Sequence, residues 1–235
     1  MNAIFSKFNK AKTQGFARTL EVHFNRFVPP WVFRYSKGDI YDLDIERLRA
    51  LGQQNTDQDD RLVAKCLAET ADPEERNRLR EFTWNSVPIE TTTNDLGYAI
   101  YDAVEPGKLL AGLWAGIGSF SENNLGVEFN FSAHQAWLYC AFVHADARGR
   151  GVYKKLISFA ASDLQERGFS QLLGIVQPWN RISRAMHEKQ SRGVCGTMSA
   201  IREGSFVWVS HQGDISVDRQ LVTDAASNPV NVSIH

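Results

Sequence analysis

A loop of alternating arginines and glycines is the part of this sequence that most clearly suggests chemistry. Residues 148–151 read Arg-Gly-Arg-Gly and follow an apolar, aromatic stretch at 136–143. That stretch has the length and composition of a strand buried on both faces. A helix is predicted to begin at Val152. Because glycine leaves the backbone accessible, successive N–H groups at a helix start can converge on an anion, and phosphate is the natural ligand.

Three polar residues form a second candidate group. Asn180, Ser183 and His187 are spaced at i, i+3 and i+7, so they lie along one face of the helix predicted from Asn180 to Gln190. Asn180 can also be interpreted as the N-cap of that helix, with His187 as a partly buried packing residue. The sequence leaves both interpretations open.

A parallel strand pair is needed to bring these residues together. The predicted strand at 136–143, a helix at 152–167 and a short apolar strand at 171–176 follow one another, which implies a right-handed parallel crossover. Two hairpins are predicted on either side of this unit. They comprise residues 96–103 with 109–118, joined by EPGK, and residues 194–202 with 206–210, turning at Glu203-Gly204.

The patterns in the first half of the chain are less regular. Residues 40–45 alternate apolar and acidic side chains, as a half-buried strand does, and a helix is expected to start at 46–51. Further helices are predicted at 61–69 and at 73–84, where a proline and two glutamates make a good helix start. Residues 119–132 begin with polar side chains and indicate an insertion near the surface.

Three segments divide the chain. Residues 1–37 combine regularly spaced phenylalanines with Lys and Arg, which is the pattern of a basic amphipathic helix. Such a helix can lie on a membrane as a peripheral foot, with cations over anionic lipid, or it can dock on its own domain. Residues 38–211 contain the predicted elements. Residues 212–235 lose periodicity and are predicted to be a polar C-terminal tail.

Composition and charge limit the classes of partner. The chain has 235 residues, of which 43% are hydrophobic and 23% are charged, as in an ordinary globular protein. It carries 26 basic and 27 acidic residues, and up to Gly38 there are seven basic residues against one Glu. The remainder therefore has 19 basic and 26 acidic residues. A field of that sign repels phosphate chains, so we expect no nucleic-acid partner.

The cysteines indicate a reducing compartment. Cys66, Cys140 and Cys195 are widely spaced, odd in number and form no CxxC pair. This favours reduced thiols over a disulfide framework or a zinc site. The sequence shows no signal-peptide pattern and no run near the roughly 18 to 20 apolar residues of a membrane span. We expect a cytoplasmic protein without a metal site, in which the basic segment at 1–37 is the candidate for contact with the inner membrane face.

At the loop and the polar helix the sequence resembles the GNAT superfamily of acyl-CoA-dependent N-acetyltransferases, over roughly Leu96 to Ser210. The family's loop pattern is Gln or Arg, two residues, Gly, one residue, then Gly or Ala. Here it reads Arg148, Gly151 and Tyr153, so the last position departs from the commonest form. The family's following helix often carries Asn, Ser and Tyr at the spacing of the three polar residues above, and here His replaces Tyr.

The resemblance implies an α+β fold, with a mixed, mostly antiparallel GNAT-like sheet, a central splayed parallel strand pair and flanking helices. It also implies that acetyl-CoA, or another acyl-CoA, is the donor. The pyrophosphate would bind backbone N–H groups at the helix start, and pantetheine would lie between the splayed strands. The residues expected to contact the donor are Phe142, Val143, Arg148, Gly149, Arg150, Gly151, Val152, Tyr153, Asn180 and Ser183.

The proton-transfer groups are assigned less directly. A released thiolate has a conjugate acid with a reference pKa of about 8.5, and a His with a reference pKa of about 6.5 can deliver a proton to it, so His187 is the candidate general acid. Many family members carry a Glu base on the central strand. In this sequence Trp137 occupies that position. Glu122, Glu128 and His134 lie in the chain before that strand. Each is either a base, acting directly or through water, or a solvated surface residue.

The resemblance implies an enzyme that transfers an acetyl or other acyl group from acyl-CoA to a primary amine of a small molecule. A weaker resemblance to bacterial GNAT proteins of surface-polysaccharide biosynthesis favours an amino sugar as the acceptor. Two alternatives stay open: a module that senses acyl-CoA without catalysis, and a loop that binds a different phosphate ligand. The sequence leaves the oligomeric state open, a homodimer included.

Overall fold

The computed structural model describes residues 27–29, 32–53, 61–68, 71–83 and 94–235. Positions 1–26 of the predicted basic helix lie outside these residues, so contact of this segment with a membrane remains a prediction. None of the described helices is both long enough and apolar enough to cross a membrane.

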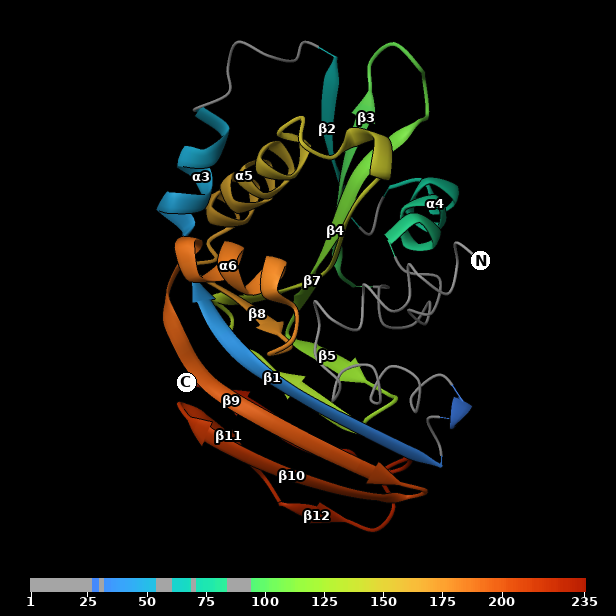
Figure 1. Ribbon diagram of the computed structural model, residues 1–235, viewed down its shortest axis with the longest axis vertical. Helices are drawn as coiled ribbons and strands as arrows, with labels where there is room; N and C mark the ends of the chain where they lie inside the picture. Colours follow the sequence, from blue (N-terminus) through green and yellow to red (C-terminus); the bar gives the residue numbers. More distant parts are fainter. Residues whose placement is uncertain (1–26, 30–31, 54–60, 69–70, 84–93) are drawn as a thin grey trace, which may run out of the picture.

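Helices and strands are interspersed along the described chain (Figure 1). In order they are β1 Phe33–Leu43, α3 Ile45–Gln53, β2 Leu62–Leu67, α4 Pro73–Thr83, β3 Leu96–Asp102, β4 Leu109–Ile117, β5 Ser119–Glu122, β6 Val127–Asn130, β7 Gln135–Val143, η2 Ala145–Ala147, α5 Val152–Glu166, β8 Gln171–Val176, α6 Arg181–Gln190, β9 Ser191–Glu203, β10 Phe206–Gly213, β11 Ile215–Val217, β12 Leu221–Val222 and β13 Val230–Ile234.

Nine strands form one large sheet in the order β12-β10-β9-β1-β8-β7-β4-β3-β2. Its neighbouring strands are antiparallel except for β7 and β8, which run parallel and are connected by α5. Both predicted hairpins are present, as β3–β4 and β9–β10. The predicted α+β fold with a central parallel pair is confirmed.

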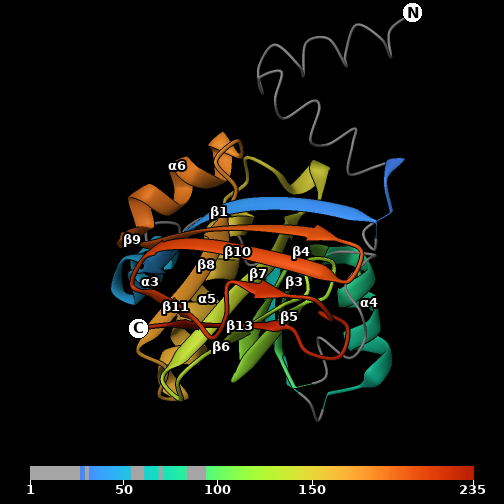
Figure 2. The same cartoon turned by 90° about the horizontal axis from the view of Figure 1, so that it is seen from below.

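The large sheet is covered on both faces. Leu48 of α3 and Leu156 of α5 are buried with Leu113 of β4 in one core cluster. On the other face, α4 and a second sheet in the order β11-β13-β6-β5 cover the strands, and Val127 of β6 is buried in one cluster with Trp137 of β7. Figure 2 shows this small sheet beside β9 and β10.

The C-terminal residues belong to the second sheet. β13 pairs in parallel with β6 and antiparallel with β11. Val230 and Val232 are completely buried, and Ile234 is 4% exposed. The prediction of a polar tail at 212–235 is therefore wrong. Its last apolar residues alternate with polar ones at every second position, and that spacing buries one face of a strand.

Two predictions in the first half of the chain also differ from the structure. The helix predicted at 61–69 is strand β2, in which Leu62 and Leu67 are buried while the strand pairs antiparallel with β3. A short apolar run fits the helix and strand periods alike. Strand β1 begins at Phe33 and pairs with β9 from there, so residues 33–37 belong to the large sheet and not to an N-terminal extension.

A buried carboxylate links α4, β4 and β7. Asp95, 3% exposed, accepts hydrogen bonds from the Tyr139 hydroxyl at 2.6 Å and from the Ile117 N–H at 3.3 Å. Arg76 of α4 donates to the Asp95 carbonyl oxygen at 3.0 Å. Burial raises the pKa of Asp95 to about 6, although these hydrogen bonds and the Arg76 charge act in the opposite direction.

The pKa of Asp95 predicts a pH-dependent stability. The unfolded chain loses this proton near pH 3.8 and the folded chain near pH 6, so the folded state binds more protons between these values. The Asp95 contribution to the free energy of unfolding therefore falls as pH rises through this window. As pH rises through this window, the wild type should lose about 2–3 kcal/mol of its free energy of unfolding, and Asp95→Asn should not. Urea unfolding of both proteins at several pH values measures this change.

Tyr139→Phe is the companion variant, because it removes the hydroxyl that donates to the carboxylate. The pKa of Asp95 should then rise further, and the fall should extend to higher pH. A pH dependence that is identical in wild type and Asp95→Asn would contradict the assignment.

Candidate active site

The parallel strands β7 and β8 separate at the end that faces the glycine loop. Among the described residues they pair only at 135–137 with 171–173, although β7 continues to Val143 and β8 to Val176. β7 also bulges at Cys140, where its register against β4 shifts and φ is 52°, in the left-handed region. The predicted splayed pair is present.

The glycine loop opens helix α5. Gly149 and Gly151 both have φ of 76°, a conformation that favours glycine. Gly151 is the N-cap of α5, and no side chain in the described part of the chain caps this helix, so its first N–H groups lack a side-chain acceptor there. A Cβ added at Gly149 would meet no described atom within 4 Å. The loop is therefore open toward a ligand and has the geometry of an anion site.

Arg148 closes the turn between β7 and the loop. Its Nε donates to the Val143 carbonyl oxygen at 3.3 Å, across the short helical turn η2. Val143 pairs with Ala111 of β4 and packs against the core, whereas Phe142 is 37% exposed. The two predicted donor contacts on β7 thus lie at the open end of the splayed pair.

Asn180 is the N-cap of α6, as one of the two interpretations of the sequence expected. Its side-chain oxygen accepts a hydrogen bond from the Ser183 N–H at 3.2 Å. Both residues also line a cavity beside β8. The cap therefore fixes the helix start at the wall of that cavity.

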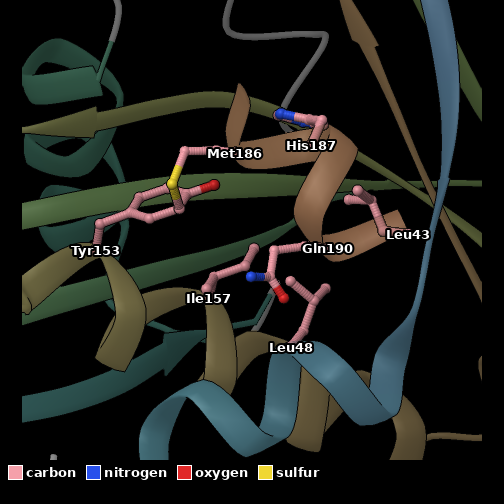
Figure 3. A pocket seen from close by; sticks show the side chains of 7 residues that line it. All are labelled: Leu43, Leu48, Tyr153, Ile157, Met186, His187 and Gln190. Carbon is pink, nitrogen blue, oxygen red and sulfur yellow. The ribbon is translucent and has the colours of Figure 1, made fainter. Parts of the chain in front are cut away.

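His187 lies one turn further along α6 and reaches the gap between the strands. Its ring contacts that of Tyr41, with centroids 5.4 Å apart. A Cβ added at Gly174 of β8 would be 3.6 Å from His187 Nε2 and 3.5 Å from the Leu138 carbonyl oxygen of β7. Nε2 therefore lies where β7 and β8 part, next to a position that has no side chain. His187 also borders a small cavity between α3, α5 and α6 (Figure 3).

The hydrogen bonding of His187 assigns its ring proton. Nδ1 lies 2.8 Å from the Ser183 carbonyl oxygen, which can only accept, so Nδ1 carries the proton. In the neutral ring Nε2 then presents a lone pair. Burial lowers the pKa of His187 below 6.5, although the Ser183 hydrogen bond raises it, so the ring is neutral at pH 7. His187 is thus placed to accept a proton before it delivers one, whereas the sequence predicts a general acid at this position.

The cavity that Asn180 and Ser183 line has a volume of about 220 Å³. It lies on the face of the splayed pair that is opposite to the His187 ring. Ile175 of β8 lines it, and this side chain points away from the face that Gly174 leaves to His187. Trp137, which occupies the position of the expected base, forms an aromatic wall with Phe120 and Phe129. Among the described residues that line the cavity, Glu122 of β5 is the only charged one.

The other two candidate bases lie elsewhere. Glu128 of β6 alternates with Phe129, so it faces away from this cavity and lines a separate one with Arg202. His134 is in the exposed turn before β7, at the end of the strand that is away from the glycine loop, and its ring contacts the Ser132 hydroxyl. The structure therefore does not bring Glu128 or His134 together with His187.

Sequence reasoning missed most of the residues that shape the 220 Å³ cavity. The expected surface insertion at 119–132 is the β5–β6 hairpin, and it stacks Phe129 on Trp137 with ring centroids 4.9 Å apart. Gly38 and Met198 reach the cavity from β1 and β9. No local motif marks these residues, because they meet only through the pairing of distant strands.

A comparison with known families decides where the chain belongs. The model described as Acetyltransferase (GNAT) family matches residues 60–191, more than half of the chain. The chain belongs to the GNAT acetyltransferases. The family resemblance inferred from the loop and the polar helix is confirmed, and GNAT acetyltransferases use acyl-CoA donors. No curated protein matches this GNAT sequence.

Several solved structures are similar to this GNAT protein. A functionally unknown conserved protein from Staphylococcus epidermidis ATCC 12228 has 6% identity and a TM-score of 0.48, with 73% of this chain and 63% of that chain covered. AAC(6')-Iy, solved with the bisubstrate analog CoA-S-monomethyl-acetylneamine, has 21% identity and a TM-score of 0.40, with 55% and 88% covered. An aminoglycoside acetyltransferase from an uncultured soil metagenomic sample, in complex with trehalose, has 19% identity and a TM-score of 0.40, with 56% and 88% covered. The chain thus spans less than two thirds of the first of these proteins, and the family assignment rests on the sequence match.

Gly151→Asp should abolish acetyl-CoA binding by the GNAT protein. The new carboxylate stands at the start of α5, where it repels an anionic pyrophosphate. Gly151→Asn is the matched control, because asparagine has a similar size, tolerates a positive φ and is neutral. We expect calorimetry to show at least about tenfold weaker binding for the Asp variant than for the Asn variant. Equal affinities would contradict the loop assignment.

His187→Phe should lower turnover and leave acetyl-CoA affinity nearly unchanged. Phenylalanine preserves a ring beside Tyr41 but has no nitrogen, and general acid–base catalysis contributes about 10²- to 10⁴-fold. The measurement is the ratio of the wild-type kcat to the variant kcat at each pH. Ionisation of the acceptor affects both rates equally and therefore cancels in this ratio. Because Nε2 must be unprotonated to accept, this ratio should be constant above pH 6.5 and shrink as pH falls through the lowered pKa of His187. A ratio near one at every pH would remove His187 from the mechanism.

Proposed function

We propose that this GNAT protein is an N-acetyltransferase that moves the acetyl group of acetyl-CoA to a primary amine of a small molecule. One observation carries the proposal: β7 and β8 splay between an uncapped helix start at one end and a cavity of about 220 Å³ on one face. A transfer from acyl-CoA to an amine requires a phosphate site, a slot for an extended arm and a separate acceptor space. These three features meet that requirement.

The donor side is formed by the glycine loop and the two strands. The pyrophosphate accepts hydrogen bonds from the backbone N–H groups of residues 149–153, where the helix start has a partial positive charge. Arg148 and Arg150 add positive charge next to this site. Pantetheine lies in the gap beside Phe142 and Val143, with the start of α6 on the same wall.

Amide formation moves one proton from nitrogen to sulfur. The amine nitrogen bonds to the thioester carbonyl carbon, the C–S bond breaks, the nitrogen loses a proton and the thiolate gains one. His187 Nε2 takes the proton from nitrogen and passes it to sulfur, which suits its neutral state and its place at the gap. Backbone N–H groups of β7 beyond its last pair with β8 stabilise the carbonyl oxygen as negative charge develops on it.

A covalent route through Cys140 is unfavourable. Burial and the negative charge of Glu122 raise the pKa of the Cys140 thiol to about 12. At neutral pH the thiol therefore stays protonated and is a weak nucleophile. Direct attack of the amine on the thioester is the simpler route.

The acceptor space favours an amino sugar. Phe120, which is half-buried, offers aromatic surface for the apolar face of a sugar ring, and the buried rings of Trp137 and Phe129 support it from behind. The volume of about 220 Å³, against roughly 10–15 Å³ needed to hold one water on the same measure, leaves room for a molecule of monosaccharide size.

The test follows free thiol from acetyl-CoA in the presence of glucosamine, an aminoglycoside or a simple alkylamine. We expect amine-dependent thiol release and an N-acetylated product in mass spectrometry. Thermal stabilisation by acetyl-CoA without thiol release for any amine would instead favour an acyl-CoA sensor. Stabilisation by nucleotides but not by coenzyme A would favour a different phosphate ligand.

A further inference from the structure

Among the described residues that line the 220 Å³ cavity, one carboxylate is the only charged group. Glu122 is the last residue of β5 and shares a strand face with Phe120, two positions earlier. The ring of Phe120 lies 6.1 Å from that of Trp137 and 4.7 Å from that of Tyr139, between centroids. The hairpin therefore brings a carboxylate to the wall where the central strand itself has Trp137 and no acidic group.

The surroundings of Glu122 disfavour its negative charge. Burial raises its pKa, while hydrogen bonds with Asn124 and the positive charge of Arg34 act in the opposite direction. None of the described residues that line the cavity is basic. Glu122 is half-buried, and a carboxylate partly withdrawn from water is stabilised by positive charge, so a cation that enters the cavity adds to the effect of Arg34.

The aromatic floor of the cavity adds an apolar contact. Trp137 and Phe129 stack with ring planes 22° apart and are 1% and 2% exposed, so the half-buried Phe120 is the ring that a ligand can reach. Aromatic faces attract cations and also pack against apolar surface. A ligand with an ammonium group and an apolar face matches the carboxylate and this ring together.

We propose that Glu122 binds the ammonium group of the acceptor, and that the acceptor is a small cationic amine without an anionic group beside the reacting nitrogen. This inference rests on the proposed acetyl transfer and specifies its acceptor. A phosphate or carboxylate in the same space is repelled by Glu122. A free amino sugar therefore fits better than its phosphorylated form.

Glu122 can also accept the first proton that leaves the ammonium group of the acceptor. An ammonium ion has no lone pair, so one proton must leave nitrogen before attack. The Glu122 carboxylate accepts that proton and later releases it to water, while the second proton moves from nitrogen to sulfur during amide formation. Proton count and charge then balance for an ammonium ion and acetyl-CoA giving an amide, a thiol and one released proton.

Glu122→Gln tests the proposal, because it removes the charge and preserves the shape. The probes are glucosamine, glucosamine 6-phosphate and glucose, with binding measured by calorimetry and transfer measured by thiol release. We expect the Kd and the KM for glucosamine to rise about 10- to 100-fold, which is the change that loss of a hydrogen bond to a charged group produces. The preference for glucosamine over glucose and over the 6-phosphate should shrink, and the affinity for acetyl-CoA should stay at the wild-type value.

Glu128→Gln is the matched control, since it makes the same change on β6 with a side chain that faces a separate cavity. It should bind glucosamine as the wild type does. Unchanged glucosamine affinity and KM in Glu122→Gln, with thiol release intact, would overturn the role of Glu122 and leave the proposed transfer standing. Absence of thiol release with every amine in the wild type would overturn the transfer, and loss of glucosamine binding in Glu122→Gln would still support the cation site. An intact melting temperature and acetyl-CoA affinity show that the variant is folded.

Discussion

The structure depends on one interruption of backbone pairing, the point where β7 and β8 stop sharing hydrogen bonds. Each strand keeps its other neighbour beyond this point, with β7 against β4 and β8 against β1. The sheet therefore stays continuous around a local gap. Buried backbone groups that lack partners cost free energy, so a gap in the middle of a sheet persists only when something else stabilises it. Here the bulge at Cys140 turns β7 aside, and α6 lies across the opening with His187 against Gly174.

The sequence could predict those parts of the site that are built from neighbouring residues. The strand at 136–143, the glycine loop and α5 follow one another without interruption, and each has a local pattern. The spacing of Asn180 and His187 likewise needs only the geometry of one helix. These elements were predictable because their structure is set by residues within a few positions of each other.

The acceptor side could not be predicted in this way. Glu122 and Trp137 come together because the β5–β6 hairpin folds back over the large sheet, and the sequence around 119–132 reads as polar chain when taken alone. The mistaken helix at 61–69 and the mistaken tail at 212–235 have the same origin. The first segment is a short apolar run that fits both periods, and in the second the apolar residues are separated by polar ones. In both, burial by distant strands decides what the local pattern leaves open.

The pairing of β13 with β6 has a consequence for the order of folding. Val127 pairs with Val230 and Asn130 with Ser233, and the chain between them includes β7, α5, β8, α6, β9 and β10. Contacts over such a separation close late, because a long loop must lose its freedom before any gain in packing. During synthesis on the ribosome, the β5–β6 hairpin that carries Glu122 is therefore made well before its partner strand, and this wall of the 220 Å³ cavity stays incomplete until β13 has followed.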